Sequence, residues 1–258
     1  MSALVVPAWA EASLWGLAAG AGLLLGAAGG YFLSLSHRAI AAIMAFGGGV
    51  LLSVLAFELV EDAAMHGGIG PTVAGVFGGA ALFSAVNWQL SRYGARHRKR
   101  CGGCVTQPTE AEVPGSGLAI AVGALMDGIP ESIVLGLAVI GGLGIEGSVL
   151  AGFFVANLPQ GFSSAAGMKQ ALRPAGYIFG VWTTIVVACG VAAWLGYAVV
   201  GRLAPWSVGV SVALAGGGVL AMLAETMIPE AFEKAPSFMG LITATGFLLA
   251  FALTRLVT

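Results

Sequence analysis

The chain has 258 residues, of which 58% are hydrophobic and only 9% are charged, with a net charge of −1 and a mean hydropathy of +0.95. Soluble globular domains carry about 25% charged residues, so this composition excludes a water-soluble domain and predicts a membrane protein. The net charge says little about partners, because the distribution of charge between the two sides of a membrane carries the information.

Apolar runs of the length that a membrane span needs, about 20 residues, recur along the whole chain. They are continuous rather than alternating, which favours helices over the strands of a β-barrel. The first run has no basic residue before it, and it has no convincing small-residue cleavage site. We therefore expect a retained span rather than a signal peptide. We predict one all-α transmembrane domain over 1–258 with eight helices, at 14–35, 39–60, 71–90, 117–143, 147–168, 175–200, 207–228 and 238–257.

The basic residues orient these spans, because Lys and Arg are retained on the cytoplasmic side. If both termini lie outside, nine of the eleven basic residues fall inside. These nine are Arg38, Arg92, Arg96, Arg98, Lys99, Arg100, Lys169, Arg173 and Lys234. We therefore expect a multi-pass protein of the plasma (inner) membrane, in contact with membrane lipid and with both termini extracytoplasmic.

The second predicted span contains one half of an internal repeat. The segments "GGGVLLSVLAFELVEDA" (47–63) and "GGGVLAMLAETMIPEAF" (216–232) align without a gap and place Glu61 opposite Glu230. The predicted topology gives the two segments opposite directions. Inverted repeats of this kind are typical of alternating-access transporters, although glycine-rich helix starts also recur simply to allow close packing.

The one long polar connection, 91–116, separates the third predicted helix from the fourth and is expected to be cytosolic. Its "RHRKR" run (96–100) is typical of a positive-inside anchor rather than of nucleic-acid binding. Cys101 and Cys104 have the spacing of a metal site, but a structural zinc ion takes about four ligands and only His97 is near. We expect reduced thiols in a loop, with metal capture there as an open alternative, and Cys189 as a buried apolar residue.

The fourth predicted helix contains "MDGIPESIVLG" (126–136), with two carboxylates deep in an apolar run. Asp127 and Glu131 are one helical turn apart and therefore face the same direction. A charge at that depth costs on the order of 3 kcal/mol, so such residues usually face a cavity or a ligand. Pro130 lies between them and removes a backbone hydrogen bond, which frees a carbonyl oxygen nearby.

The fifth predicted helix repeats this arrangement in "VANLPQGFSSAAG" (155–167), where Asn157 and Gln160 flank Pro159. Two such helices can present oxygen ligands to one shared point near the middle of the membrane. Ser132, Ser163 and Ser164 extend the polar face. A purely structural role of these residues is the alternative.

These motifs, together with "ETMIPEA" (225–231) at the end of the seventh span, resemble the ZIP family of divalent metal transporters. The resemblance implies a ZIP-like helix bundle, alternating access, and a transported zinc, iron(II) or manganese ion as substrate, with no resident cofactor. In that family the fourth span typically reads His-Asn-x-Pro-Glu-Gly. On this pattern Asp127 stands at the His position and Glu131 at the Glu, while Asn157 and Gln160 stand at the second ligand and the acid of the fifth span.

The departures from the family pattern concern the ligands themselves. Both motif histidines are absent and the acid of the fifth span is the amide of Gln160. The two remaining carboxylates balance one divalent ion rather than two. An oxygen-rich shell is harder than one with His or Cys, so we expect selectivity to move from zinc toward manganese, iron(II) or magnesium.

Further acidic residues lie toward the ends of the second and seventh spans, where they would concentrate cations. We expect Glu58, which stands where the family often has His, and Glu61 to guide ions on the outer side. Glu225 and Glu230 are expected to do so on the inner side. Asp62 and Glu233 are interpreted as ordinary interfacial charges. His66 is interpreted as a loop residue, with a capture role at the outer face as an open alternative.

The residues do not favour an enzyme. Intramembrane serine and metalloproteases need a His within a span, whereas all three histidines fall at predicted loops. An aspartyl protease needs two intramembrane aspartates, and Asp127 is the only one. The open alternatives are a divalent metal carrier and a transport-inactive relative that binds or senses metal, with a homodimer as one open assembly and no nucleic-acid partner.

Overall fold

The computed structural model describes residues 6–33, 36–93, 109, 112–113, 116–140, 147–233 and 237–257. Helices account for nearly all of these residues, and no strand occurs among them. The expected all-α class is therefore confirmed. The main helices are α1 (Ala8–Phe32), α2 (His37–Val54), α3 (Val60–Gly67), α4 (Ile69–Ser91), α5 (Ser116–Ala138), α6 (Gly147–Gln170), α7 (Ala175–Ala198), α8 (Pro205–Met222), α9 (Ile228–Glu233) and α10 (Met239–Val257).

Two pairs of these helices are parts of longer continuous rods. A π-helical turn, η1 (Leu55–Leu59), joins α2 to α3, and a second, η4 (Leu223–Met227), joins α8 to α9. We name the first rod the α2–α3 rod and the second the α8–α9 rod. Both continue beyond the ends predicted at 60 and 228, because the charged residues there continue the helix instead of ending it.

Six of the described helices are long and apolar enough to cross a membrane by length and composition. The two further spans predicted from the sequence, α6 and α10, are not in this set. Helix α6 has the length, but its amide and hydroxyl residues make it less apolar, and the apolar part of α10 is shorter. A multi-pass membrane protein is thus supported, while the number eight stays a prediction.

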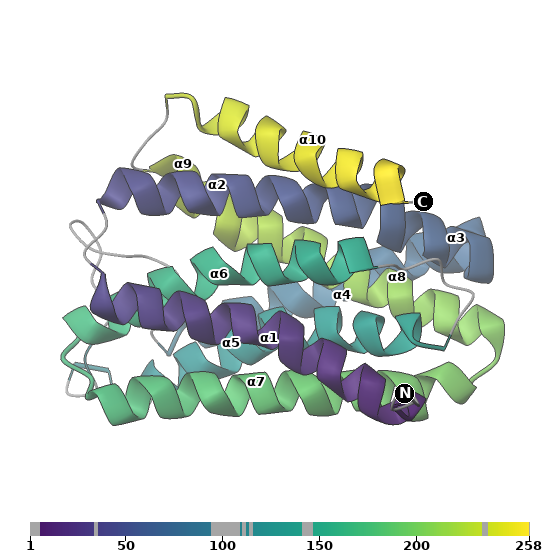
Figure 1. Cartoon of the computed structure of the whole chain (residues 1–258), viewed down its shortest axis with the longest axis horizontal. Coiled ribbons are helices and arrows are strands. Elements are labelled where there is room, and N and C mark those ends of the chain that lie inside the picture. Colours follow the sequence, from purple (N-terminus) through teal and green to yellow (C-terminus); the bar gives the residue numbers. More distant parts are fainter. Residues whose placement is uncertain are drawn as a thin grey trace, which may run out of the picture.

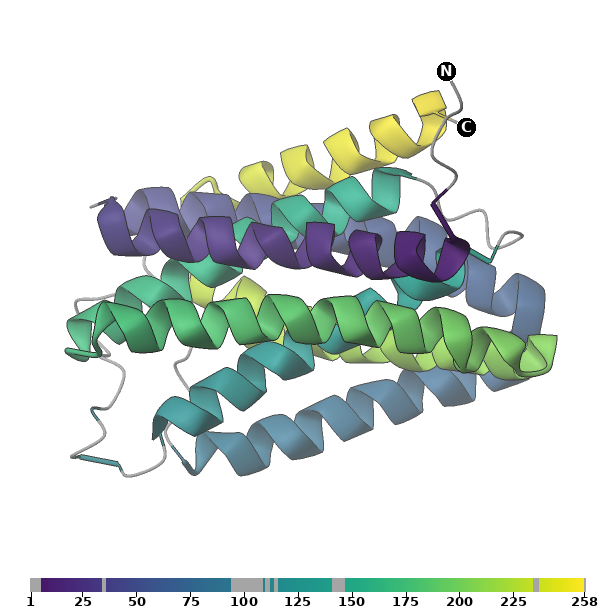
Figure 2. The same ribbon diagram turned by 60° about the horizontal axis from the view of Figure 1, so that its bottom comes forward.

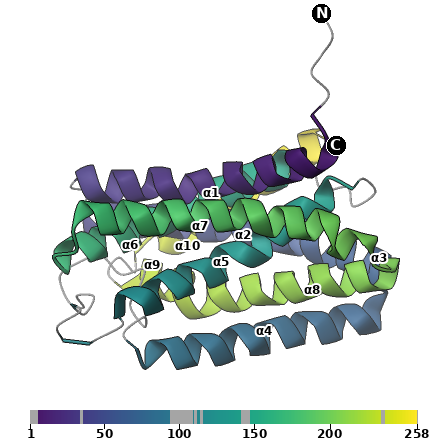
Figure 3. The same ribbon diagram turned by 90° about the horizontal axis from the view of Figure 1, so that it is seen from below.

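The helices lie side by side along the long axis of the molecule (Figure 1). Both chain termini lie at one end of the bundle, and α4 ends and α5 begins at the other (Figures 1 and 3). Arg38 at the start of α2, Arg92 after α4, and Lys169 and Arg173 at the end of α6 share this second end. The described basic residues thus segregate by end as the sequence predicted.

Packing joins the helices in a small number of extensive pairs. Helix α1 packs on α6 and α7, α5 packs on α7, α2 packs on α10, and α4 packs on α8. Figures 2 and 3 show α4 at one edge of the bundle, and Figure 2 shows α10 at the opposite edge. Helix α4 exposes large apolar side chains along its length, as a lipid-facing helix does, including Ile69, Val73, Phe77, Leu82 and Trp88.

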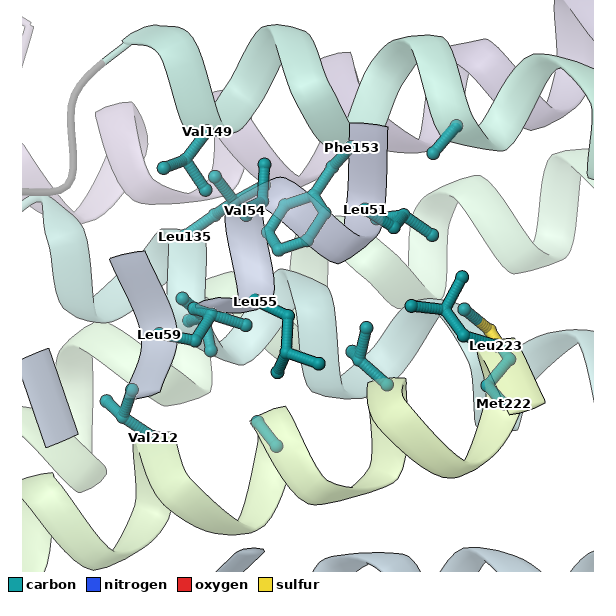
Figure 4. Packing of buried hydrophobic residues seen from close by; sticks show 14 of the residues in the cluster. Leu51, Val54, Leu55, Leu59, Leu135, Val149, Phe153, Val212, Met222 and Leu223 are labelled. Atoms are coloured by element: carbon teal, nitrogen blue, oxygen red, sulfur yellow. The ribbon is translucent and has the colours of Figure 1, made fainter. Parts of the chain in front are cut away.

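The centre of the bundle is a cluster of aliphatic side chains around the α2–α3 rod. Figure 4 shows side chains from α2, α5, α6 and α8 meeting there, among them Leu51, Leu55, Leu59, Leu135, Phe153 and Met222. In a membrane such contacts hold helices together by van der Waals packing, because lipid tails are as apolar as the core itself.

Glycines let particular helix pairs approach closely. A Cβ atom added at Gly79 of α4 would overlap the carbonyl oxygen of Leu214 in α8, and one at Gly217 of α8 would overlap that of Val76 in α4. The α2·α10 pair has the same reciprocal arrangement through Gly49 and Gly246. Small residues at such interfaces are the usual means of close helix packing in membranes.

Candidate functional site

Helix α5 buries both predicted carboxylates. Asp127 is 4% exposed and Glu131 is 1% exposed. The chain continues as helix through Pro130, which has no N–H, so the carbonyl of Met126 lacks its usual amide donor. The hydroxyl of Ser132 donates to the carbonyl oxygen of Gly128 at 2.8 Å, which folds that side chain back onto its own helix.

Helix α6 buries the two predicted amides to the same degree. Asn157 and Gln160 are each 2% exposed, and the helix continues through Pro159. The Asn157 Nδ2 donates to the carbonyl oxygen of Ala19 in α1 at 3.0 Å. That bond fixes the orientation of the amide, and the oxygen Oδ1 is directed away from the carbonyl of Ala19.

Two polar groups of α6 have no hydrogen-bond partner within the described part of the chain. They are the Nε2 of Gln160 and the hydroxyl of Ser163, both buried. Buried polar groups are nearly always satisfied by protein, water or ligand. This stretch of α6 therefore retains capacity to bind water or a ligand.

The structure buries all four predicted midplane residues, but it does not show that the two pairs meet. Helix α6 packs mainly on α1 and α2, helix α5 packs mainly on α7, and α5 and α6 contact each other only slightly. No three His, Cys, Asp or Glu side chains of the described residues are grouped so that they could hold one ion. The shared metal position therefore stays a prediction.

The other face of α5 borders an apolar cavity of about 380 Å³. Met126 and Pro130 line it, together with Phe83 of α4 and Leu214 of α8. Met126 thus lies on the cavity side of α5. The cavity separates this part of α5 from the α4·α8 pair.

The acidic residues of the α2–α3 rod differ from one another in burial. Glu58 lies within the π turn η1 and is buried, whereas Glu61 is exposed. Asp62, interpreted as an interfacial charge, is 5% exposed, because the helix turns it toward the bundle. His66, interpreted as a loop residue, lies in the last turn of α3. The loop interpretation of His66 was wrong, because the helix does not end at residue 60 but continues to Gly67.

In the α8–α9 rod, Glu225 lies in the π turn η4 and accepts hydrogen bonds from helix α4. The hydroxyl of Ser84 donates to one of its carboxylate oxygens, and the Nδ2 of Asn87 donates to the other at 2.7 Å. Neither donor was predicted, although their spacing of three residues in an apolar helix could have indicated them. Glu230 is half-buried in α9.

The two π turns give a different pairing of the repeated segments from the ungapped sequence alignment. They begin at Leu55 and Leu223, whereas the alignment places Leu55 opposite Ala224. Matching the turns puts Asp62, rather than Glu61, opposite Glu230. It also puts Gly49 opposite Gly217, the two glycines that approach α10 and α4 closely.

Cys189 is buried in α7, as expected. Cys101, Cys104 and His97 lie outside the described residues, and so does Lys234. Comparison of the sequence with models of known protein families gives no match, and comparison with curated proteins gives none either.

Proposed function

We propose that this protein is a ZIP-like carrier that moves a divalent metal ion across the membrane by alternating access. The observation that supports this most is the burial of Asp127 and Glu131, one turn apart on an apolar membrane helix beside Pro130. Carboxylates at that depth are costly unless a cation, a proton or water balances them.

The proposed site holds one ion between α5 and α6. Two carboxylates offset the charge of one divalent cation, and Asn157 and Gln160 would add neutral amide ligands. The orientation of Asn157, whose nitrogen is bound to α1, supports the use of its oxygen. This donor set suits manganese, iron(II) or magnesium better than a set containing imidazole or thiolate.

Alternating access requires one group of helices to move relative to another. The cavity between α5 and the α4·α8 pair supports such a motion, because helices separated by a cavity have fewer contacts to break. The α2–α3 and α8–α9 rods each carry a π turn with a glutamate, and π turns are frequent at functional sites. Glu58 and Glu61 would guide ions at the outer side, and Glu225 and Glu230 at the inner side.

Uptake of metal by proteoliposomes tests this proposal. Asp127→Ala and Glu131→Ala should each abolish saturable manganese uptake, while thermal unfolding in detergent stays near that of the wild type or improves, because a buried carboxylate is removed. Glu11→Gln, which removes an exposed carboxylate in the first turn of α1, should transport normally. Wild-type uptake by a folded Asp127→Ala, Glu131→Ala double variant would refute the site. Metal binding without any uptake by the wild type would instead support the transport-inactive relative.

A further inference from the structure

Asp62 is a buried carboxylate whose surroundings favour the binding of a cation. It is 5% exposed, and its Oδ2 has no hydrogen-bond partner in the described part of the protein. The titratable groups that act on it are Glu58, Glu61 and His66, so two of the three are themselves carboxylates. A buried carboxylate oxygen without a donor is expensive, and a bound cation removes that cost.

The ring of His66 is oriented as in a metal-binding histidine. Its Nδ1 lies 2.9 Å from the backbone carbonyl oxygen of Asp62. A carbonyl oxygen only accepts, so in the neutral imidazole Nδ1 carries the proton and Nε2 keeps its lone pair. Histidines that bind metals usually donate their other ring N–H to a carbonyl or carboxylate in this way.

Asp62 and His66 are one helical turn apart, about 6 Å along the axis, and face the same side. Two side chains at this spacing can share one ion, as in other helical metal sites. Glu58 lies one turn deeper, about 12 Å from His66 along the axis, which is too far for one ion to touch both. Asp62 is therefore the common member of two successive pairs, with His66 on the outside and Glu58 on the inside.

We propose that Asp62 and His66 form a capture site for a divalent transition-metal ion at the outer end of the α2–α3 rod, with water completing the shell. Figure 1 shows α3 at the same end of the bundle as both termini, which is the predicted outer side. The ion then passes to the Asp62–Glu58 pair. This role in transport rests on the function proposed above, but the binding itself does not.

The imidazole gives the capture site a selectivity that the midplane site lacks. Imidazole nitrogen binds manganese, iron(II), cobalt and zinc far better than it binds magnesium, which prefers oxygen ligands and retains its water. The capture site therefore discriminates against magnesium before an ion reaches the oxygen-rich residues of α5 and α6.

Pulsed electron paramagnetic resonance of bound manganese(II) tests the capture site directly, because it detects a coordinating imidazole nitrogen. The measurement uses the full chain in detergent with Asp127→Ala and His97→Gln, which remove a midplane carboxylate and the histidine of the predicted loop. We expect a nitrogen coupling that disappears on His66→Gln, and manganese affinity at this site that falls at least tenfold on Asp62→Asn.

Glu11→Gln is the control, because it removes an exposed carboxylate in the first turn of α1 that belongs to neither proposed site. It should retain the nitrogen coupling and bind manganese within about threefold of the parent. A coupling that survives His66→Gln, or no nitrogen coupling in the parent at saturating manganese, overturns the capture site. Transport separates the two proposals: His66→Gln should raise the KM for manganese with little change in kcat, whereas Asp127→Ala should abolish uptake.

Discussion

At the residue scale, two helix ends illustrate how backbone conformation decides the effect of a substitution. Leu172 follows α6 with a φ of 59°, and Gly68 follows α3 with a φ of 78°. The left-handed conformation costs an L-residue with a side chain roughly 1–2 kcal/mol, and glycine adopts it freely. At the end of α6, the amide of Arg173 donates to the carbonyl of Met168 across Leu172, as in other left-handed helix ends.

We expect Leu172→Gly to stabilise the protein by about 1 kcal/mol, because it removes this strain. The side chain is 86% exposed, so little packing is lost. Gly68→Ala should destabilise by a similar amount through strain alone, since nothing lies within 4 Å of the new Cβ. Reversible unfolding in mixed detergent measures both changes. Changes in the free energy of unfolding that have the same sign for both substitutions would contradict this explanation.

Ligand identity is also decided at the residue scale. Asp127→His with Gln160→Glu restores the family ligands and keeps two carboxylates in the site. Only the softness and the positions of the ligands therefore change. We expect the double variant to shift preference toward zinc relative to manganese by about tenfold, or about 1.4 kcal/mol of differential binding. Competition uptake or calorimetry measures the ranking. An unchanged ranking would mean that these positions do not contact the ion.

At the element scale, the pairing of α4 with α8 depends on direct backbone approach. Gly79→Ala places a Cβ against the carbonyl oxygen of Leu214, a backbone atom that cannot rotate away. We expect a loss of about 1–3 kcal/mol of stability, and weaker positioning of Asn87 against Glu225. Gly78→Ala is the matched control one residue earlier, with open space around its Cβ, and should be neutral or stabilising by up to about 1 kcal/mol.

Thermal unfolding of both glycine variants, followed by metal uptake of those that fold, distinguishes packing from function at this helix pair. Similar stability losses for the two variants would indicate that helix propensity, rather than close approach, determines the effect of an added methyl group.

At the scale of the whole molecule, the segregation of basic residues predicts orientation in the membrane. A reporter fused after Thr258 should be extracytoplasmic and one inserted near Gly102 cytoplasmic, since basic residues are retained inside. The shared position of both termini at one end of the bundle, opposite the end of α4 (Figure 1), agrees with this arrangement. Reporters found on the same side would refute the eight-span topology.

The sequence alone determined the class of protein and the burial of the polar residues in α5 and α6. Continuous apolar runs specify membrane helices through composition, which needs no knowledge of contacts. The burial of Asp127, Glu131, Asn157 and Gln160 followed from their positions within such runs.

Only the tertiary structure decided where the α2–α3 and α8–α9 rods end and which of their acidic residues are buried. A π turn adds a residue to a helix and rotates everything after it, and no local pattern marks it. The turn η1 places Asp62 inside and leaves Glu61 exposed, a difference that the sequence did not predict. Likewise, the contacts of Ser84 and Asn87 with Glu225 join residues far apart in the chain, so they depend on how α4 packs against the α8–α9 rod.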